Sequence, residues 1–402
     1  MVNTASLVTR LKADLADAAE FQSVLLDYYS RSTYLADRKI GYGREEGVAA
    51  LIVAFTKAGH VAGISPGPAF IEEEIDTIAL LVQTQLIDEA PTAIGRRIMF
   101  ASLPLEGCFK YQDRFQILPV PPEAPRPQFA VDGHPFQLEV AFKDTTAVSV
   151  RMRRLMRAAH EVELLCGALL GPGVHATSNQ TRFHWVIDNY EGEPAYSYRQ
   201  EGYSWPGMKG IWADGFSSLD GLSAAPMLPA QAYYTTNSIR IGEPLSLPDT
   251  LTKSLDTFFT LPRKEREQFL AACYWYEQSS RIRSISGSAS FVALVSAIEA
   301  LTSIPESTIC LTCGQNKGSG PTQLFAEFIE KFVPDSSATP ATRKALYRLR
   351  SQITHGDKIL LSDRAEWIGG FVYSQERSES LRLSAAVRIA LINWLLSRPS
   401  KS

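Results

Sequence analysis

The stretch TPATRKALYRLRSQITHG, residues 339–356, predicts an α-helix that stops at a glycine. Gly356 suits the left-handed backbone conformation that often follows the last residue of a helix, so we expect His355 in the last helical turn. The carbonyl groups at a helix end favour a cationic imidazole. We therefore expect His355 at the rim of its domain, where it can exchange protons with a ligand.

Four other segments of the C-terminal region have helical patterns, and no convincing strand lies between them. PRKEREQFLAACYWYEQSSRIR starts with a proline at a first-turn position and carries apolar residues at helical spacing. SASFVALVSAIEALTS is rich in small and branched apolar residues, which is typical of a helix buried on most sides. Residues 262–402 are therefore predicted to form an all-α bundle. Its five helices are expected at 262–283, 288–303, 321–333, 339–356 and 378–397.

The first 250 residues mix helical and strand patterns. Leu7, Leu11 and Leu15 recur at helical spacing, which predicts one helix that runs to about Tyr29. The predicted fold class is therefore α+β, with a mixed α/β N-terminal region before the bundle. Further helices are predicted at 72–85 and 148–170, and strands at 98–103, 136–142, 183–190 and 195–203.

A segment rich in proline, glycine and polar residues, 241–255, is the expected domain boundary. We expect residues 1–250 to form a sensing or regulatory domain, as one body or two subdomains, and residues 262–402 to form the helical domain. The formal net charge is −3, yet the chain from residue 262 onward holds 18 Lys and Arg against 13 Asp and Glu. This excess favours a polyanionic partner for the bundle, although uneven surface charge without a partner explains it equally well.

The composition, 45% hydrophobic and 21% charged residues, is that of an ordinary globular protein. The longest apolar run, 48–55, is far shorter than the roughly 18 residues of a membrane span, and the N-terminus lacks the apolar region of a secretory leader. The five cysteines are an odd number in a chain too long to need a disulfide framework. We therefore expect a cytoplasmic protein without a membrane partner.

Cys310 and Cys313, in CLTCGQNKGSG, resemble half of a zinc knuckle. A zinc site needs four ligands and the sequence has no second CxxC pair, so Cys273, a histidine or the same pair of a second subunit would have to complete it. The Cys310 and Cys313 pair therefore either binds a structural zinc ion or lies in an ordinary loop with reduced cysteines. The sequence contains no P-loop, HExxH or GxGxxG motif.

Arg350, Ser351 and His355 form an R-x4-H motif in which a polar residue follows the arginine. HEPN domains are helical bundles that share an R-x(4–6)-H motif late in the penultimate helix, and LYRLRSQITHG resembles the Apea-like HEPN branch. The helix FVALVSAIEALTS and the apolar helix that ends INWLLS also lie where such domains have them. The resemblance covers residues 262–402.

For HEPN nucleases this resemblance implies RNA endonuclease activity that requires no metal or other cofactor. The ribose 2′-hydroxyl attacks the adjacent phosphate and leaves a 2′,3′-cyclic phosphate. The resemblance makes His355 the general acid or base, and makes Arg350 the group that stabilises charge on the phosphorane through its bidentate fork. Ser351, on the same helical face as His355, would orient the imidazole or touch the phosphate.

Helical geometry places Arg350 about 140° round the helix from His355, at ~100° per residue, so a compact site within one chain is awkward. Family members typically dimerise, so that two such helices face one another and pool their Arg and His residues. A homodimer is therefore expected.

The bare motif occurs about once by chance in a chain of this size. Arg153 and Arg154 also match it with His160, and Arg348 is a second arginine that can pair with His355. The competing interpretation is a helix-end histidine and a surface arginine in a structural bundle, and many HEPN domains are not catalytic.

Three functions follow from these observations. The first is an RNA-cleaving HEPN enzyme of anti-phage defence by abortive infection, in which the N-terminal region responds to a phage-derived trigger or restrains the nuclease. The second is an inactive HEPN-type binding or dimerisation module. The third is a ligand-binding protein that acts through the ten aromatic residues between Trp185 and Tyr234, which can stack on bases or sugars but more often fill a core.

Overall fold

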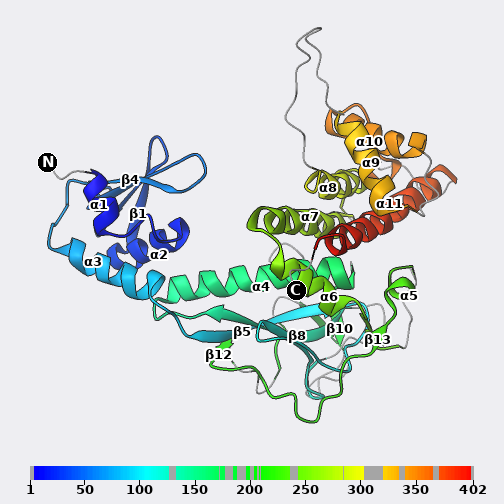
Figure 1. The fold of residues 1–402 in the computed structure, drawn as a ribbon, viewed down its shortest axis with the longest axis horizontal. Coiled ribbons are helices and arrows are strands. Elements are labelled where there is room, and N and C mark those ends of the chain that lie inside the picture. The colour runs from blue at the N-terminus through cyan, green and yellow to red at the C-terminus, as the bar shows by residue number, and fades with distance from the viewer. Residues whose placement is uncertain are drawn as a thin grey trace, which may run out of the picture. The chain divides into compact units, whose positions relative to one another are not determined.

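The computed structural model has the α+β fold that the sequence predicts, with antiparallel sheets and helices in the N-terminal region and mostly helices from about residue 250 to 396 (Figure 1). Within the described part of the chain, no helix combines the length and the apolar character needed to cross a bilayer. The described residues are 4–125, 133–171, 173–176, 184–187, 196–199, 203–205, 208, 210–235, 243–283, 285–302, 320–334, 340–364 and 371–399.

The chain divides into two compact units. Three elements contribute residues to both units, namely β5 (Thr92–Ala101), β8 (His134–Lys143) and α4 (Val148–Leu170). The first unit comprises Met1–Arg96, Glu139–Ala159 and Gly210–Ser217. The second comprises Arg97–Leu138, His160–Lys209 and Ser218–Ser402.

The expected boundary at 241–255 does not coincide with this division, because that segment lies inside the second unit. There β14 (Leu247–Pro248) pairs in parallel with β13 (Met227–Leu228), and α6 (Leu251–Thr260) begins directly afterwards. Phe258 of α6 is fully buried and packs on Phe269. Proline and glycine mark the ends of elements as well as the ends of domains, and here they mark a short strand and a helix start.

The first unit contains a four-stranded antiparallel sheet that the sequence did not predict. Its strands are short, and in β3 strictly buried positions alternate with partly buried ones, so the sequence pattern of the sheet is weak. Side chains such as Phe21, Val53 and Ile75 join the helices and the sheet in one buried core. The elements are β1 (Arg31–Leu35), β2 (Lys39–Gly43), β3 (Leu51–Phe55), β4 (Val61–Pro66), α1 (Thr4–Arg10), α2 (Ala18–Tyr29), α3 (Glu74–Val82) and a π-helical turn η1 (Gln83–Ile87).

The single N-terminal helix predicted to run to Tyr29 is wrong, because the chain forms α1 and α2 instead. Lys12 has a positive φ of 52°, and the carboxylate of Asp17 accepts the backbone N–H groups of Ala19 and Glu20 at 3.0 and 3.1 Å. An aspartate that satisfies the first donors of a helix favours a new helix start over continuation of the old one. Leu15, expected on the apolar stripe, is 69% exposed.

Alanine in place of Asp17 is expected to lower the free energy of unfolding by about 1 kcal/mol, because two helix donors lose their acceptor. Burial by itself would raise the pKa of Asp17, but the Glu20 N–H and the charge of Arg157 outweigh it and lower the pKa. The contribution of this carboxylate is therefore complete above the unfolded value of about 3.9 and is lost as pH falls through the lowered pKa. In urea unfolding, the free energy of unfolding of Asp17→Ala should lie below that of the parent protein at pH 7, and this difference should shrink near pH 2. Asp14→Ala, at an exposed position, is the control.

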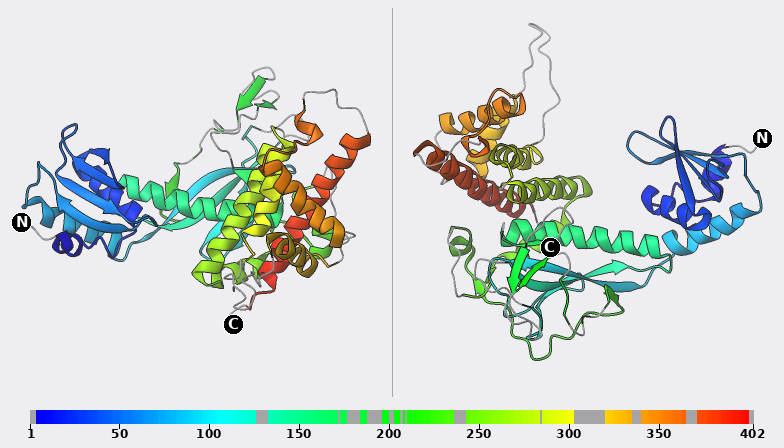
Figure 2. Two further views of the ribbon diagram at one scale, coloured as in Figure 1. Left: turned by 90° about the horizontal axis from the view of Figure 1, so that it is seen from above. Right: turned by 180° about the vertical axis from the view of Figure 1, so that it is seen from behind.

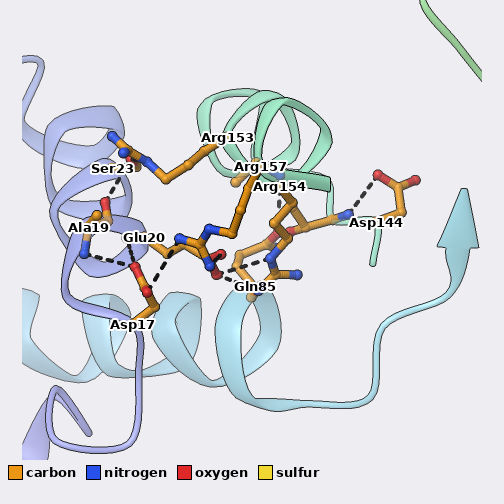
Figure 3. A network of polar contacts seen from close by, with 11 residues as sticks. Asp17, Ala19, Glu20, Ser23, Gln85, Asp144, Arg153, Arg154 and Arg157 are labelled. Carbon is orange, nitrogen blue, oxygen red and sulfur yellow. Dashed lines mark hydrogen bonds and ion pairs between the residues drawn. The ribbon is translucent and has the colours of Figure 1, made fainter. Parts of the chain in front are cut away.

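Arginines near the start of α4 (Val148–Leu170) hold that helix within the first unit. Arg154 donates to Glu20 at 3.0 and 2.8 Å and to the carbonyl of Gln85 at 3.2 Å (Figure 3). Arg157 lies 3.3 Å from Asp17 in the same network. These guanidinium groups therefore form hydrogen bonds and ion pairs that stabilise the fold.

A six-stranded sheet has the order β12-β5-β8-β7-β6, with β9 paired to β5. The predicted strands at 98–103 and 136–142 are confirmed as parts of β5 and β8, and those at 183–190 and 195–203 as β10 and β11. The bounds are β5 (Thr92–Ala101), β6 (Phe109–Tyr111), β7 (Phe115–Pro119), β8 (His134–Lys143), β9 (His175–Ala176), β10 (His184–Ile187), β11 (Tyr196–Arg199) and β12 (Trp212–Ala213); α5 (Ala230–Thr235) follows.

Each of the five helices predicted for the C-terminal region is present. Phe269 of the first stacks on Trp394 of the last, with ring centroids 5.7 Å apart, and both side chains are buried. The further views in Figure 2 show these helices, coloured from yellow-green to red, packed against one another. They are α7 (Arg263–Ile282), α8 (Gly287–Glu299), α9 (Pro321–Phe332), α10 (Pro340–Thr354) and α11 (Phe371–Leu396).

Candidate functional site

Arg350 lies near the C-terminal end of α10, where its guanidinium is held by the end of α8. Its Nη2 donates to Oε2 of Glu299 at 2.9 Å. The hydroxyl of Tyr347 donates to Oε1 of the same carboxylate at 2.7 Å, and the Tyr347 ring centroid lies 5.7 Å from the guanidinium carbon. One carboxylate therefore orients both side chains.

The cluster of Arg350, Tyr347 and Glu299 remains partly open to solvent, since the side chains of Arg350 and Glu299 are 24% and 29% exposed. Partial burial and the Glu299 carboxylate raise the pKa of Tyr347 to about 12, so its hydroxyl stays a hydrogen-bond donor at neutral pH. The Nε of Arg350 is buried and has no hydrogen-bond partner among the described residues. Because Nε is buried, a ligand that reaches Arg350 from solvent meets the Nη groups, of which Nη2 already donates to Glu299.

His355 directly follows the last residue of α10, and its side chain is exposed. Gly356 has a positive φ of 81°; its N–H donates to the Ile353 carbonyl at 3.1 Å, and the Asp357 N–H donates to the Gln352 carbonyl at 2.8 Å. These two bonds form a Schellman motif, so the predicted role of Gly356 in ending the helix is confirmed. The imidazole is therefore presented at a capped helix end and is not packed inside the bundle.

Ser351 is half-buried, and its backbone carbonyl accepts the His355 N–H at 3.0 Å. The structure thus joins Ser351 to His355 through the backbone. Among the described residues, no hydrogen bond joins the side chains of Arg350 and His355 within one chain. This agrees with their different directions round the helix.

Tyr347 and Glu299 were missed from the sequence, although a signal for each exists. Tyr347 is one helical turn before Arg350, and Glu299 is the acidic residue of the otherwise apolar stretch FVALVSAIEA. What could not be seen was that α8 and α10 pack so that these residues meet.

The competing motif in α4 has a structural explanation. Arg154 is held by Glu20, whereas His160 lies 3.9 Å from the Glu163 carboxylate, and its hydrogen bond to Glu163 raises its pKa. Arg348, the other arginine near His355, is exposed on α10.

The predicted zinc ligands Cys310 and Cys313 lie outside the described residues. Cys273, considered as a further ligand, is fully buried in α7, and burial raises the pKa of its thiol, which disfavours the thiolate that zinc binds. In the part of the chain that the structure describes, no group of three His, Cys, Asp or Glu side chains could hold a metal ion.

The aromatic rings expected between 185 and 234 are packed where the structure describes their side chains. Tyr203 is buried against Phe100, with ring centroids 5.8 Å apart. Tyr233 and Tyr234 lie 5.4 and 4.9 Å from the guanidinium carbon of Arg388. These rings contribute to the packing of the second unit, which is the more common use of clustered aromatics.

No protein-family model matches the chain, and no curated protein or solved structure is significantly similar to it. The proposal for its function is therefore carried by the residues around α10 and by their chemistry.

Proposed function

We propose that the helical domain is a HEPN-type RNA endonuclease that requires no metal and acts as a homodimer. The observation that carries this proposal is the exposed imidazole of His355, held at a capped helix end on the same helix as the oriented guanidinium of Arg350. An imidazole changes charge near neutral pH and can move protons, whereas a guanidinium fork matches phosphate oxygens.

In the proposed reaction the ribose 2′-oxygen attacks the adjacent phosphorus, and the bond from phosphorus to the 5′-oxygen breaks. His355 takes the proton of the 2′-hydroxyl while water protonates the departing 5′-oxygen, or His355 protonates that oxygen while water takes the 2′ proton. Arg350 offers its remaining N–H donors to the phosphorane, while Glu299 keeps the guanidinium in place. Ser351 is proposed to assist His355 through its position one turn earlier.

In this proposal the homodimer brings Arg350 of one chain to His355 of the other, because helix geometry sets positions 350 and 355 about 140° apart, at ~100° per residue. The role in anti-phage defence, with an N-terminal region that responds to a phage-derived trigger, is part of this proposal. The resemblance of LYRLRSQITHG to the Apea-like branch supports that role.

The ion pair between Arg350 and Glu299 favours one alternative, a binding or dimerisation module without activity. A carboxylate that neutralises the guanidinium competes with a substrate phosphate for it. The cleavage assay that follows distinguishes the two functions.

Purified protein incubated with mixed RNA in EDTA is expected to produce fragments that end in 2′,3′-cyclic phosphate. Arg350→Ala should cleave about 10²–10³-fold more slowly, because a preorganised donor to the transition state is lost. Arg350→Lys should recover only part of the rate, since lysine keeps the charge but not the fork. Arg348→Ala, at an exposed position two residues earlier, is the matched control and should keep full activity.

Equal cleavage by Arg350→Ala and the parent protein would contradict the proposal and indicate a contaminating nuclease. Because Arg350→Ala leaves Glu299 without its guanidinium, thermal unfolding of each variant must accompany the assay.

A further inference from the structure

A cavity of about 510 Å³ is lined by residues from the end of α7, the start of α8, the segment 360–362 and the N-terminal part of α11. Figure 1 labels these three helices. We call this cavity the basic cavity. All of its lining residues belong to the second unit. They include Arg281, Arg283, Arg377, Ser362, Ser380 and Glu376.

Two of these arginines lack a carboxylate partner among the residues that the structure describes, namely Arg283 and Arg377. Arg283 donates one Nη2 hydrogen bond to the Ser384 hydroxyl at 3.3 Å, whereas its buried Nε has no described partner. Burial and the nearby charge of Arg377 lower the pKa of Arg283. Two like charges are thus held near each other at one cavity, which costs free energy until an anion joins them.

The basic cavity is also lined by Arg281 and Glu376. Arg281 forms an ion pair with Glu277 one turn earlier on α7, whereas Glu376 accepts the Leu361 N–H at 2.8 Å and forms no ion pair with the described residues. The N-terminus of α8 is occupied as well, since Asp363 accepts the N–H groups of Gly287 and Ser288 at 2.6 and 2.8 Å. A ligand would therefore be bound by Arg283 and Arg377, which form no ion pair with the described residues, and by the Ser380 hydroxyl, with no contribution from the helix start.

We propose that the basic cavity binds a phosphate group between the guanidinium groups of Arg283 and Arg377, with the Ser380 hydroxyl as a further donor; the Ser362 hydroxyl already donates to Asp363 at 3.4 Å. The remaining N–H groups of two guanidinium forks and one hydroxyl offer more hydrogen-bond donors than the two oxygens of a carboxylate can accept, whereas a phosphate has more oxygens to receive them. The cavity volume falls within the range of about 300–1,000 Å³ that small-molecule sites occupy. It therefore has room for the group that carries the phosphate.

The phosphate has two sources, an RNA strand or a small phosphorylated molecule. The RNA source rests on the proposed nuclease function: Leu360 lines the basic cavity and follows His355 by five residues, a chain distance of at most ~18 Å. A strand cleaved at His355 would place a neighbouring phosphate in the basic cavity. The phosphate site itself does not depend on cleavage.

Thermal unfolding of the full chain in sodium phosphate tests the site, with sodium chloride of equal ionic strength as reference. Phosphate at about ten times its Kd is expected to raise Tm on the order of 2 °C. Arg283→Gln and Arg377→Gln should lose this rise. Arg377 is exposed, so its variant tests the site even if the variant of the half-buried Arg283 folds poorly. Arg263→Gln, at the exposed opposite end of α7, is the charge-matched control and should keep the rise.

The source is tested with a fluorescein-labelled RNA oligomer on a His355→Ala background, where the proposed cleavage cannot interfere. If RNA supplies the phosphate, Arg377→Gln weakens RNA binding several-fold and reduces the salt dependence of log K by about 1. Unchanged RNA binding beside a lost phosphate effect identifies a small phosphorylated molecule as the ligand.

The proposal is overturned if phosphate stabilises no more than chloride, or if both arginine variants respond to phosphate as the parent protein does. A phosphate effect without any RNA cleavage would support the basic cavity while the nuclease proposal fails. The two ideas are thus distinguishable in one set of proteins.

Discussion

Alanine in place of His355 is expected to slow RNA cleavage by about 10²–10⁴-fold, the usual contribution of a general acid or base. The loss should be chemical and not structural, because the imidazole is exposed and the helix end is capped through the backbone around Gly356. We expect the free energy of unfolding to change by less than about 0.5 kcal/mol, as for surface substitutions in general.

Single-turnover cleavage of a labelled RNA in EDTA measures this effect without interference from product release. Lys358→Ala, an exposed position just beyond the same helix end, is the matched control and should cleave at the parent rate. A His355→Ala protein that cleaves within twofold of the parent would remove the general acid–base role from this residue.

Alanine in place of Glu139 is expected to lower the free energy of unfolding of the first unit by about 3–5 kcal/mol. Glu139 is fully buried on β8, and its carboxylate accepts Arg96 Nε at 3.0 Å and the Ser217 N–H at 2.8 Å. The side chain of Arg96 is only 8% exposed, so removal of the carboxylate leaves a guanidinium buried without its counter-charge. Loss of one partner from such a pair costs far more than the pair itself contributes.

Urea unfolding followed by circular dichroism measures this change. Glu139→Gln keeps the size and an acceptor oxygen, so its loss should be smaller than that of Glu139→Ala. Glu267→Ala breaks the exposed pair with Arg263 and should cost less than about 1 kcal/mol, as surface pairs do. If Glu139→Ala cost no more than Glu267→Ala, the buried pair would not stabilise the first unit as described.

Sequence patterns located most of the helices because helical signals are local. The apolar repeat of SASFVALVSAIEALTS predicts a buried helix, and α8 is buried at most of its positions. The same reasoning failed at residues 7–29, where the leucine spacing continued through a break that Asp17 imposes by capping α2. It also missed the sheet of β1–β4, whose short strands are stabilised by pairing with partners that periodicity does not reveal.

The amino-acid sequence alone determined that α10 ends just before Gly356 and presents His355 at its tip. Helix periodicity and the positive φ that glycine tolerates are properties of adjacent residues. Tertiary structure alone decided that Glu299, 51 residues before Arg350, orients its guanidinium, and that Arg283 and Arg377 meet at one cavity. These contacts arise from the packing of helices distant in sequence, and such packing depends on the whole core and not on any local pattern.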